Sequence, residues 1–180
     1  MKRVICFASI ALMVLSMSSF VAVETATAET HARGTAKARG DYSTNYWGQS
    51  AGRSVQHARD YSRGYQSYAR QVPNVLPEIA RQEAKGVGQN IAAAQKQFGE
   101  LRKATTDKET LKSLDLIDKQ LAEAVKAHEL MSELCRMRTI DGDGTMKCCE
   151  DIEAALAKAF AEHQKMMRQF EDQTTTAVKN

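Results

Sequence analysis

Residues 106–135 read TDKETLKSLDLIDKQLAEAVKAHELMSELC, and their pattern is a strong indication of a helical fold. Apolar side chains return along it every three or four residues, as one face of an α-helix requires. Thr106 followed by Glu109 has the form of a capping box, so we predict a helix over about 107–138. The inner face of that helix consists of Leu111, Leu114, Ile117, Leu121, Val125, His128, Met131 and Cys135.

The same helical spacing recurs on both sides of this segment. We predict one helix over about 52–71, a second over about 77–104 and a last one that Thr145 caps. The chain has only two prolines, and no stretch alternates apolar and polar residues for long enough to predict a strand. Amphipathic helices joined by short turns predict an all-α, up-down antiparallel four-helix bundle, a single domain over residues 51–180.

The first residues have the features of an export signal. Lys2 and Arg3 precede an apolar stretch that ends at a small-x-small site, so we predict a signal peptide over 1–28. Residues 29–50 contain glycine and hydroxyl side chains without a sustained apolar period, and we predict a flexible arm there. The mature chain is then exported, periplasmic or extracellular, with no stable membrane span.

Charge and motifs narrow the classes of function. The formal net charge is +3, and the basic excess is confined to residues 29–70, which together with export argues against a nucleic-acid partner. The sequence has no nucleophile elbow, no phosphate loop after a strand and no zinc-protease motif, so we predict that it is not an enzyme. A protein partner for the bundle is left open.

The best clue to function is a cluster of sulfur and imidazole side chains around the last turn. If the last two helices pair around Gly142, Cys135 faces Cys149. Thiolate and thioether sulfur suit Cu(I), and imidazole suits copper or zinc. We also expect the first turn of the last helix to lower the pKa of a cysteine there. The candidate ligands of a soft metal ion are Cys135, Cys148, Cys149, Met131 and His128.

A disulfide between Cys135 and Cys149 is an alternative to metal binding. It would staple the hairpin in an oxidising compartment and leave Cys148 unpaired. The protein would then be a structural or partner-binding bundle without a metal.

A calcium loop is the other alternative. Residues 139–150 read TIDGDGTMKCCE, which resembles an EF-hand loop with aspartate at positions three and five, glycine at six and glutamate at twelve. The first position has threonine in place of aspartate, and Lys147 occupies position nine. The resemblance implies calcium ligands at Thr139, Asp141, Asp143, Thr145 and Glu150.

The C-terminal pattern as a whole resembles that of small exported bacterial helical proteins with no established activity. The pattern comprises His128-x-x-Met131-x-x-x-Cys135, the Cys148-Cys149 pair, and Glu162-His163 followed by Met166-Met167. It is also similar in style to four-helix copper-binding proteins, which carry many more cysteines along the core. We therefore expect one bound ion or a few, and no metal store.

Overall fold

The computed structural model describes residues 25–179 of the chain and the side chains of residues 42–172. Residues 1–24, most of the predicted signal peptide, lie outside the described part, and that peptide stays a prediction. The chain divides into two compact units, Met1–Ala36 and Lys37–Asn180, and the bundle belongs to the second unit. Over residues 25–179, none of the helices has the length and hydropathy needed to cross a bilayer.

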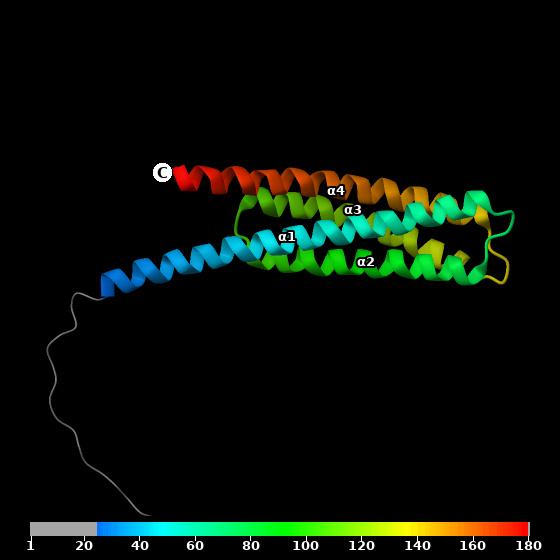
Figure 1. Ribbon diagram of the computed structural model, residues 1–180, viewed down its shortest axis with the longest axis horizontal. Coiled ribbons are helices and arrows are strands. Elements are labelled where there is room, and N and C mark those ends of the chain that lie inside the picture. The colour runs from blue at the N-terminus through cyan, green and yellow to red at the C-terminus, as the bar shows by residue number, and fades with distance from the viewer. Residues whose placement is uncertain (1–24, 180) are drawn as a thin grey trace, which may run out of the picture. The chain divides into compact units, whose positions relative to one another are not determined.

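The bundle has the predicted architecture. Its helices are α1 (Thr25–Gln71), α2 (Pro77–Ala104), α3 (Lys108–Leu134) and α4 (Gly142–Lys179). They lie side by side and alternate in direction (Figure 1), which confirms an all-α, up-down four-helix bundle. The α1–α2 and α3–α4 connections lie at the same end (Figure 1), which we call the paired-turn end.

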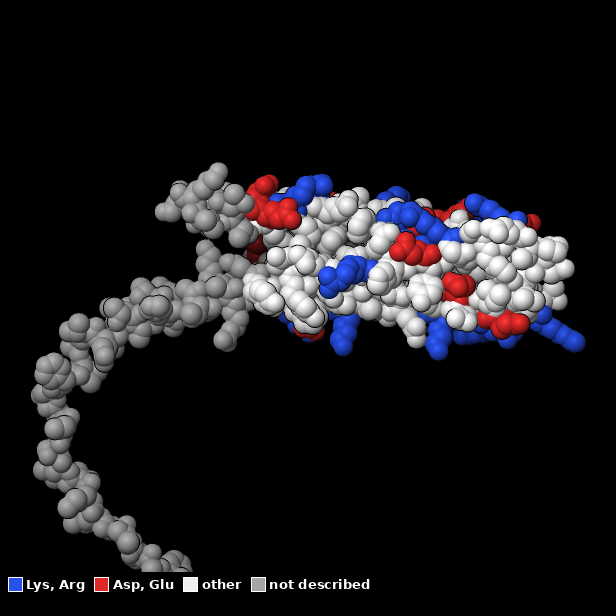
Figure 2. Space-filling view, in the orientation of Figure 1, with Lys and Arg blue, Asp and Glu red and all other residues white. Residues whose placement is uncertain are grey.

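The core follows from the amphipathic pattern of each helix. Large apolar side chains at three and four residue steps point inward, because burial removes their surface from water. Charged side chains are spread over the visible outer face of the bundle (Figure 2). The core side chains include Val87, Phe98, Leu101, Leu114, Ile117, Leu121, Ile152 and Leu156, none more than 1% exposed.

Helix α1 begins at Thr25, well before the predicted start at residue 52. Residues 29–50, predicted to be a flexible arm, are therefore helical, and Gly48 is buried. A Cβ added at Gly48 would lie 2.6 Å from the sulfur of Met167, so this glycine permits close packing and does not break the helix. For residues 42–50, contacts with other helices account for the difference, and periodicity along one helix does not detect them.

Aspartates cap both α3 and α4. The carboxylates of Asp107 and Asp141 each accept a hydrogen bond from the backbone N–H three residues later, at 2.8 Å and 3.0 Å. The predicted caps, Thr106 and Thr145, were therefore wrong. Thr145 instead lies inside the first turn of α4, where it is fully buried and its hydroxyl donates to the Asp141 carbonyl oxygen.

The inner faces of α3 and α4 repeat each other along the chain. Equivalent residues stand 35 positions apart, as His128 and His163 do. The matching pairs are Thr110 and Thr145, Ile117 and Ile152, Leu121 and Leu156, Ala124 and Ala159, His128 and His163, and Met131 and Met166. The repeat provides an internal reference, because each position at one end of the bundle has a counterpart at the other.

Candidate sulfur site at the paired-turn end

Three buried cysteines gather with one methionine at the paired-turn end. Cys135 follows the last residue of α3, and Cys148 and Cys149 lie in the first turns of α4. All three are free thiols, between 0% and 3% exposed. The Cys149 thiol donates to the thioether sulfur of Met131 at 3.6 Å. We call these four residues the sulfur site.

The thiols of the sulfur site are poor acids. Burial raises the pKa of Cys135 to about 11 and that of Cys149 to about 12, because a dry environment disfavours the thiolate. Burial also raises the pKa of Cys148, and a negative charge on any of these sulfurs would raise the pKa of the others. The expectation that the first turn of α4 lowers a cysteine pKa was wrong, because α4 begins at Gly142, Cys148 and Cys149 lie beyond its first turn, and desolvation raises their pKa values.

A polar frame fixes the backbone around the sulfur site. The Tyr65 hydroxyl donates to the Thr145 hydroxyl at 2.7 Å, and the Thr145 hydroxyl donates to the Asp141 carbonyl oxygen at 2.8 Å. Ser62 of α1 donates to the Cys149 carbonyl oxygen at 3.2 Å. The α1 helix thereby holds the start of α4 in place.

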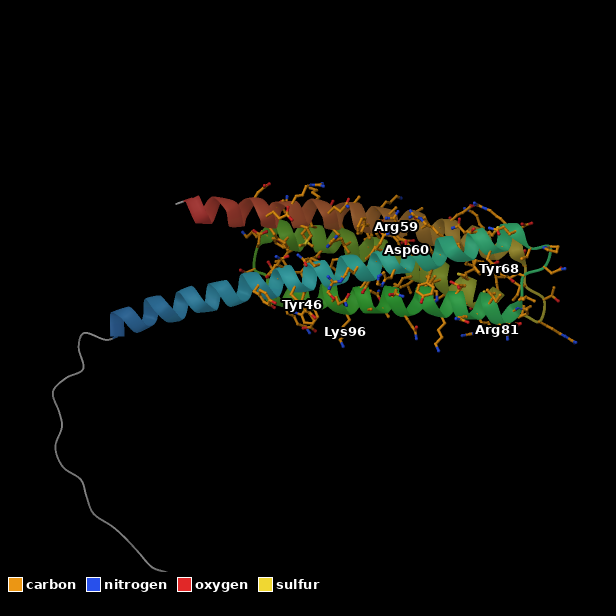
Figure 3. The ribbon with its side chains drawn as sticks, viewed as in Figure 1. Tyr46, Arg59, Asp60, Tyr68, Arg81 and Lys96 are labelled. Carbon is orange, nitrogen blue, oxygen red and sulfur yellow. The ribbon has the colours of Figure 1, made fainter. Side chains whose placement is uncertain are left out.

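The α2 helix holds the other cysteine-bearing segment. Arg81 donates through Nε to the Cys135 carbonyl oxygen at 2.9 Å, and Figure 3 shows Arg81 and Tyr68 at this end of the bundle. The Tyr68 hydroxyl accepts a hydrogen bond from the backbone N–H of Leu76 in the α1–α2 connection, at 3.0 Å. Each helix of the bundle thus contributes to the paired-turn end.

His128, a predicted metal ligand, uses its imidazole for a contact with another helix. Its Nε2 donates to the Ala84 carbonyl oxygen at 2.8 Å and lies 3.2 Å from the Ser132 hydroxyl. The ring rests against Gly88 of α2, where an added Cβ would lie 2.6 Å from Nε2. His128 therefore serves the packing of α3 on α2, and we leave it out of the sulfur site.

The predicted calcium ligands do not surround a common point. Asp141 caps α4, Thr145 is buried, and Glu150 lies 3.9 Å from Arg70 in an exposed ion pair. Residues 142–150 are helical, so Asp143 belongs to a helix and not to a coordinating loop. Among the described residues, no three His, Cys, Asp or Glu side chains are arranged so that they could hold a metal ion.

Sequence reasoning missed the role of His163. Its Nε2 donates to the Gly48 carbonyl oxygen of α1 at 2.9 Å, and its ring rests against Gly52. The two histidines of the repeat thus make the same contact with different helices. In each case the accepting carbonyl, of Gly48 or Ala84, stands four residues before the glycine under the ring. The repeated spacing of these histidines and glycines is visible in the sequence and was the signal that could have indicated these contacts.

Comparisons of the chain with protein-family models, with curated proteins and with solved structures found no match.

Proposed function

We propose that this protein is an exported, non-enzymatic bundle that binds one soft metal ion, Cu(I) in preference to Zn(II), at the sulfur site. The contact between the Cys149 thiol and the Met131 thioether carries the proposal, because it pairs the two sulfur types that select Cu(I). Two further buried thiols, of Cys135 and Cys148, lie near enough to Cys149 that a negative charge on either would raise its pKa. A low coordination number suits Cu(I), so the pair would bind first and a neighbouring thiol would complete the site.

The internal repeat supports a role for these sulfurs beyond packing. Cys148 and Cys149 correspond to Ser113 and Leu114 of α3, and Cys135 corresponds to Phe170 of α4. The same bundle plan therefore fills the equivalent positions at its other end without any cysteine. Met131 differs from the cysteines in this respect, because its counterpart is also a methionine, Met166, equally buried.

The high thiol pKa values determine how metal binding depends on pH. A metal ion binds the thiolate, so binding must release a proton from Cys149, whose pKa is about 12. Affinity should therefore rise with pH. The same pKa argues against a nucleophilic role, since little thiolate is present at neutral pH. The non-enzymatic assignment rests on this point and on the missing catalytic motifs.

Titration with Cu(I) tests the proposal. Reduced protein, handled without oxygen, competes with a coloured Cu(I) chelator, and native mass spectrometry counts the bound ions. We expect one Cu(I) for each chain, loss of binding in Cys149→Ser and weaker binding in Met131→Leu. Met166→Leu is the matched control, because Met166 is the repeat counterpart of Met131 and is also fully buried.

Two outcomes would overturn the proposal. One is that the wild-type protein fails to compete for Cu(I). The other is that Met131→Leu and Met166→Leu weaken binding equally, which would trace the effect to packing. Protein purified from its native compartment with one free thiol and no metal would instead support the Cys135–Cys149 disulfide. That alternative needs no metal, and its loop-closing effect would be worth about 2–4 kcal/mol.

A further inference from the structure

The contact between α4 and the middle of α1, at Gly48 and Gly52, includes one buried imidazole. His163 is 7% exposed, and its ring lies between two phenylalanines, with centroids 5.8 Å from Phe98 and 5.8 Å from Phe160. A Cβ added at Gly52 would lie 2.9 Å from Nε2, so the ring fills the space that a larger residue would need. The Gly48 carbonyl oxygen accepts the hydrogen bond from Nε2 at 2.9 Å.

This contact requires the neutral ring. A carbonyl oxygen only accepts, so Nε2 carries the hydrogen and the lone pair is on Nδ1. Nδ1 is buried and has no hydrogen-bond partner among the described residues. A proton added there would create a buried cation whose new N–H donor has no acceptor. Burial accordingly lowers the pKa of His163 from its ordinary value of 6.5.

Within residues 42–172, no nearby charge offsets the effect of burial on His163, and only the hydrogen bond to the Gly48 carbonyl oxygen raises its pKa. On α1 the ring meets two glycines, and the guanidinium carbon of Arg59 lies 5.6 Å from the centroid of Phe160, the ring that stacks on His163. On α2 it meets Phe98. The adjacent α4 carboxylate, Glu162, accepts hydrogen bonds from Ser113 of α3 at 2.7 Å and from Lys165 at 3.4 Å.

The remaining polar contacts of α1 are unevenly distributed. Beyond Gly52 toward the paired-turn end, the side-chain amide of Gln97 donates to the Ser54 hydroxyl at 2.8 Å, and Arg59 donates to Glu153 at 2.8 Å. On the N-terminal side of Gly48, Thr44 donates a longer hydrogen bond, at 3.5 Å, to the Ala104 carbonyl oxygen of α2. Between Gly48 and Gly52, Ser50 also bonds Gln97 of α2, whose amide accepts from the Ser50 hydroxyl at 2.9 Å and donates to the Ser50 carbonyl oxygen at 3.1 Å. His163 and Gln97 therefore both hold residues 42–53, and of these two side chains only His163 titrates.

We propose that the hydrogen bond from His163 to Gly48 is an acid-sensitive latch that holds residues 42–53 of α1 on the bundle. Protonation of the ring expels it from the space over Gly52 and releases this part of α1. Release uncovers apolar side chains that lie against Gly48, namely Met167 and Leu101. The rest of α1 stays in place through Ser54, Arg59 and Tyr65. The latch does not depend on metal binding at the sulfur site.

The sign of the pH effect follows from the direction of the pKa shift. His163 in the closed latch has a lowered pKa, so the released ring takes up a proton at higher pH than the latched ring. The latch is fully effective above pH 6.5 and weakens as the pH falls below that value. Opening becomes up to tenfold more frequent for each pH unit between the two pKa values.

Amide hydrogen exchange on the full-length protein tests the latch. Exchange is measured at pH 7.5 and pH 5, corrected for the intrinsic rate at each pH, and followed by mass spectrometry for residues 42–53 and 58–69 separately. We expect protection of 42–53 to fall about tenfold at pH 5, while 58–69 keeps its protection. His163→Gln should remove the pH dependence, because its amide can donate to the Gly48 carbonyl oxygen without titrating.

Two histidines serve as matched controls. His128→Gln changes the repeat counterpart of His163, and His57→Gln changes an exposed histidine on α1. Both variants should keep the wild-type pH dependence. If His163→Gln does not fold, NMR titration of wild-type His163 decides: its imidazole signal should titrate together with the amide signals of residues 42–53. Equal protection of 42–53 at both pH values, or titration of His163 without movement of those amides, would overturn the proposal.

Discussion

Gly52→Ala is the sharpest test of how the helices pack. A Cβ at this position would lie 2.9 Å from Nε2 of His163 and closer still to Cε1, and α1 and α4 hold the backbone and the ring together there. His163 must leave its site, or the helices must move apart. Either response costs packing energy and weakens the hydrogen bond to Gly48.

The magnitude combines opposing effects. Alanine in place of glycine within a helix stabilises it by about 1 kcal/mol. Overpacking costs about 1–3 kcal/mol, and loss of the hydrogen bond costs about 1 kcal/mol. We therefore expect Gly52→Ala to lower the free energy of unfolding by about 1–3 kcal/mol. Urea unfolding at pH 7.5 in reductant, followed by circular dichroism, measures it.

Gly64 is the matched control in the same helix. A Cβ added at Gly64 meets no atom within 4 Å, so Gly64→Ala should stabilise the protein by about 1 kcal/mol. Gly88→Ala should cost less than Gly52→Ala, because the half-buried His128 can turn toward solvent. Combining Gly52→Ala with His163→Ala should give less than the sum of the separate losses. A Gly52→Ala protein as stable as wild type would refute the proposed seating of His163.

Two further predictions concern the arginine contacts with α4 and the cap of α4. Arg59→Ala should lower the free energy of unfolding by about 1–2 kcal/mol, because its side chain is 14% exposed, bonds Glu153 and lies over Phe160. Arg63→Ala, at 51% exposure on the same carboxylate, should change it by less than about 0.5 kcal/mol, and equal losses in urea unfolding would contradict this ranking. Asp141→Ala should lower the free energy of unfolding by about 1 kcal/mol, because the Asp141 carboxylate caps α4. The loss should be the same with and without calcium. A calcium-dependent rise in melting temperature that Asp141→Ala abolishes would restore the calcium alternative.

The regular half of the bundle was predictable from the chain, and the first helix was less so. In α3, apolar residues such as Leu114, Ile117 and Leu121 recur on one face, and the structure buries all of them. In α1, Gly48 and Gly52 interrupt the local pattern, although they lie where other helices approach. Local periodicity depends on one face of one helix. It therefore does not reveal a helix that is stabilised by its contacts with other helices.

The candidate site was predictable as a group of residues but not in its chemistry. Pairing the last two helices around Gly142 placed the cysteines of α3 and α4 at one end, and the structure brings Met131 against Cys149. The direction of the thiol pKa shifts was wrong, because the extent of burial depends on α1 and α2. The prediction that His128 is a metal ligand failed for the same reason, because its Nε2 donates to the carbonyl oxygen of Ala84 on another helix.

The helical class, the number of helices and the sulfur residues near the last turn could be inferred from the chain alone, because they depend on spacing along it. Which polar atoms these residues and the two histidines bond, and how acidic the thiols are, became clear only from the packing of the helices. Each of those properties depends on a neighbour that is distant in sequence: Gly48 for His163, Ala84 for His128, and the covering helix α1 for Cys149. Hydrogen bonding and desolvation are set by such neighbours, so they cannot be inferred from the periodicity of a single helix.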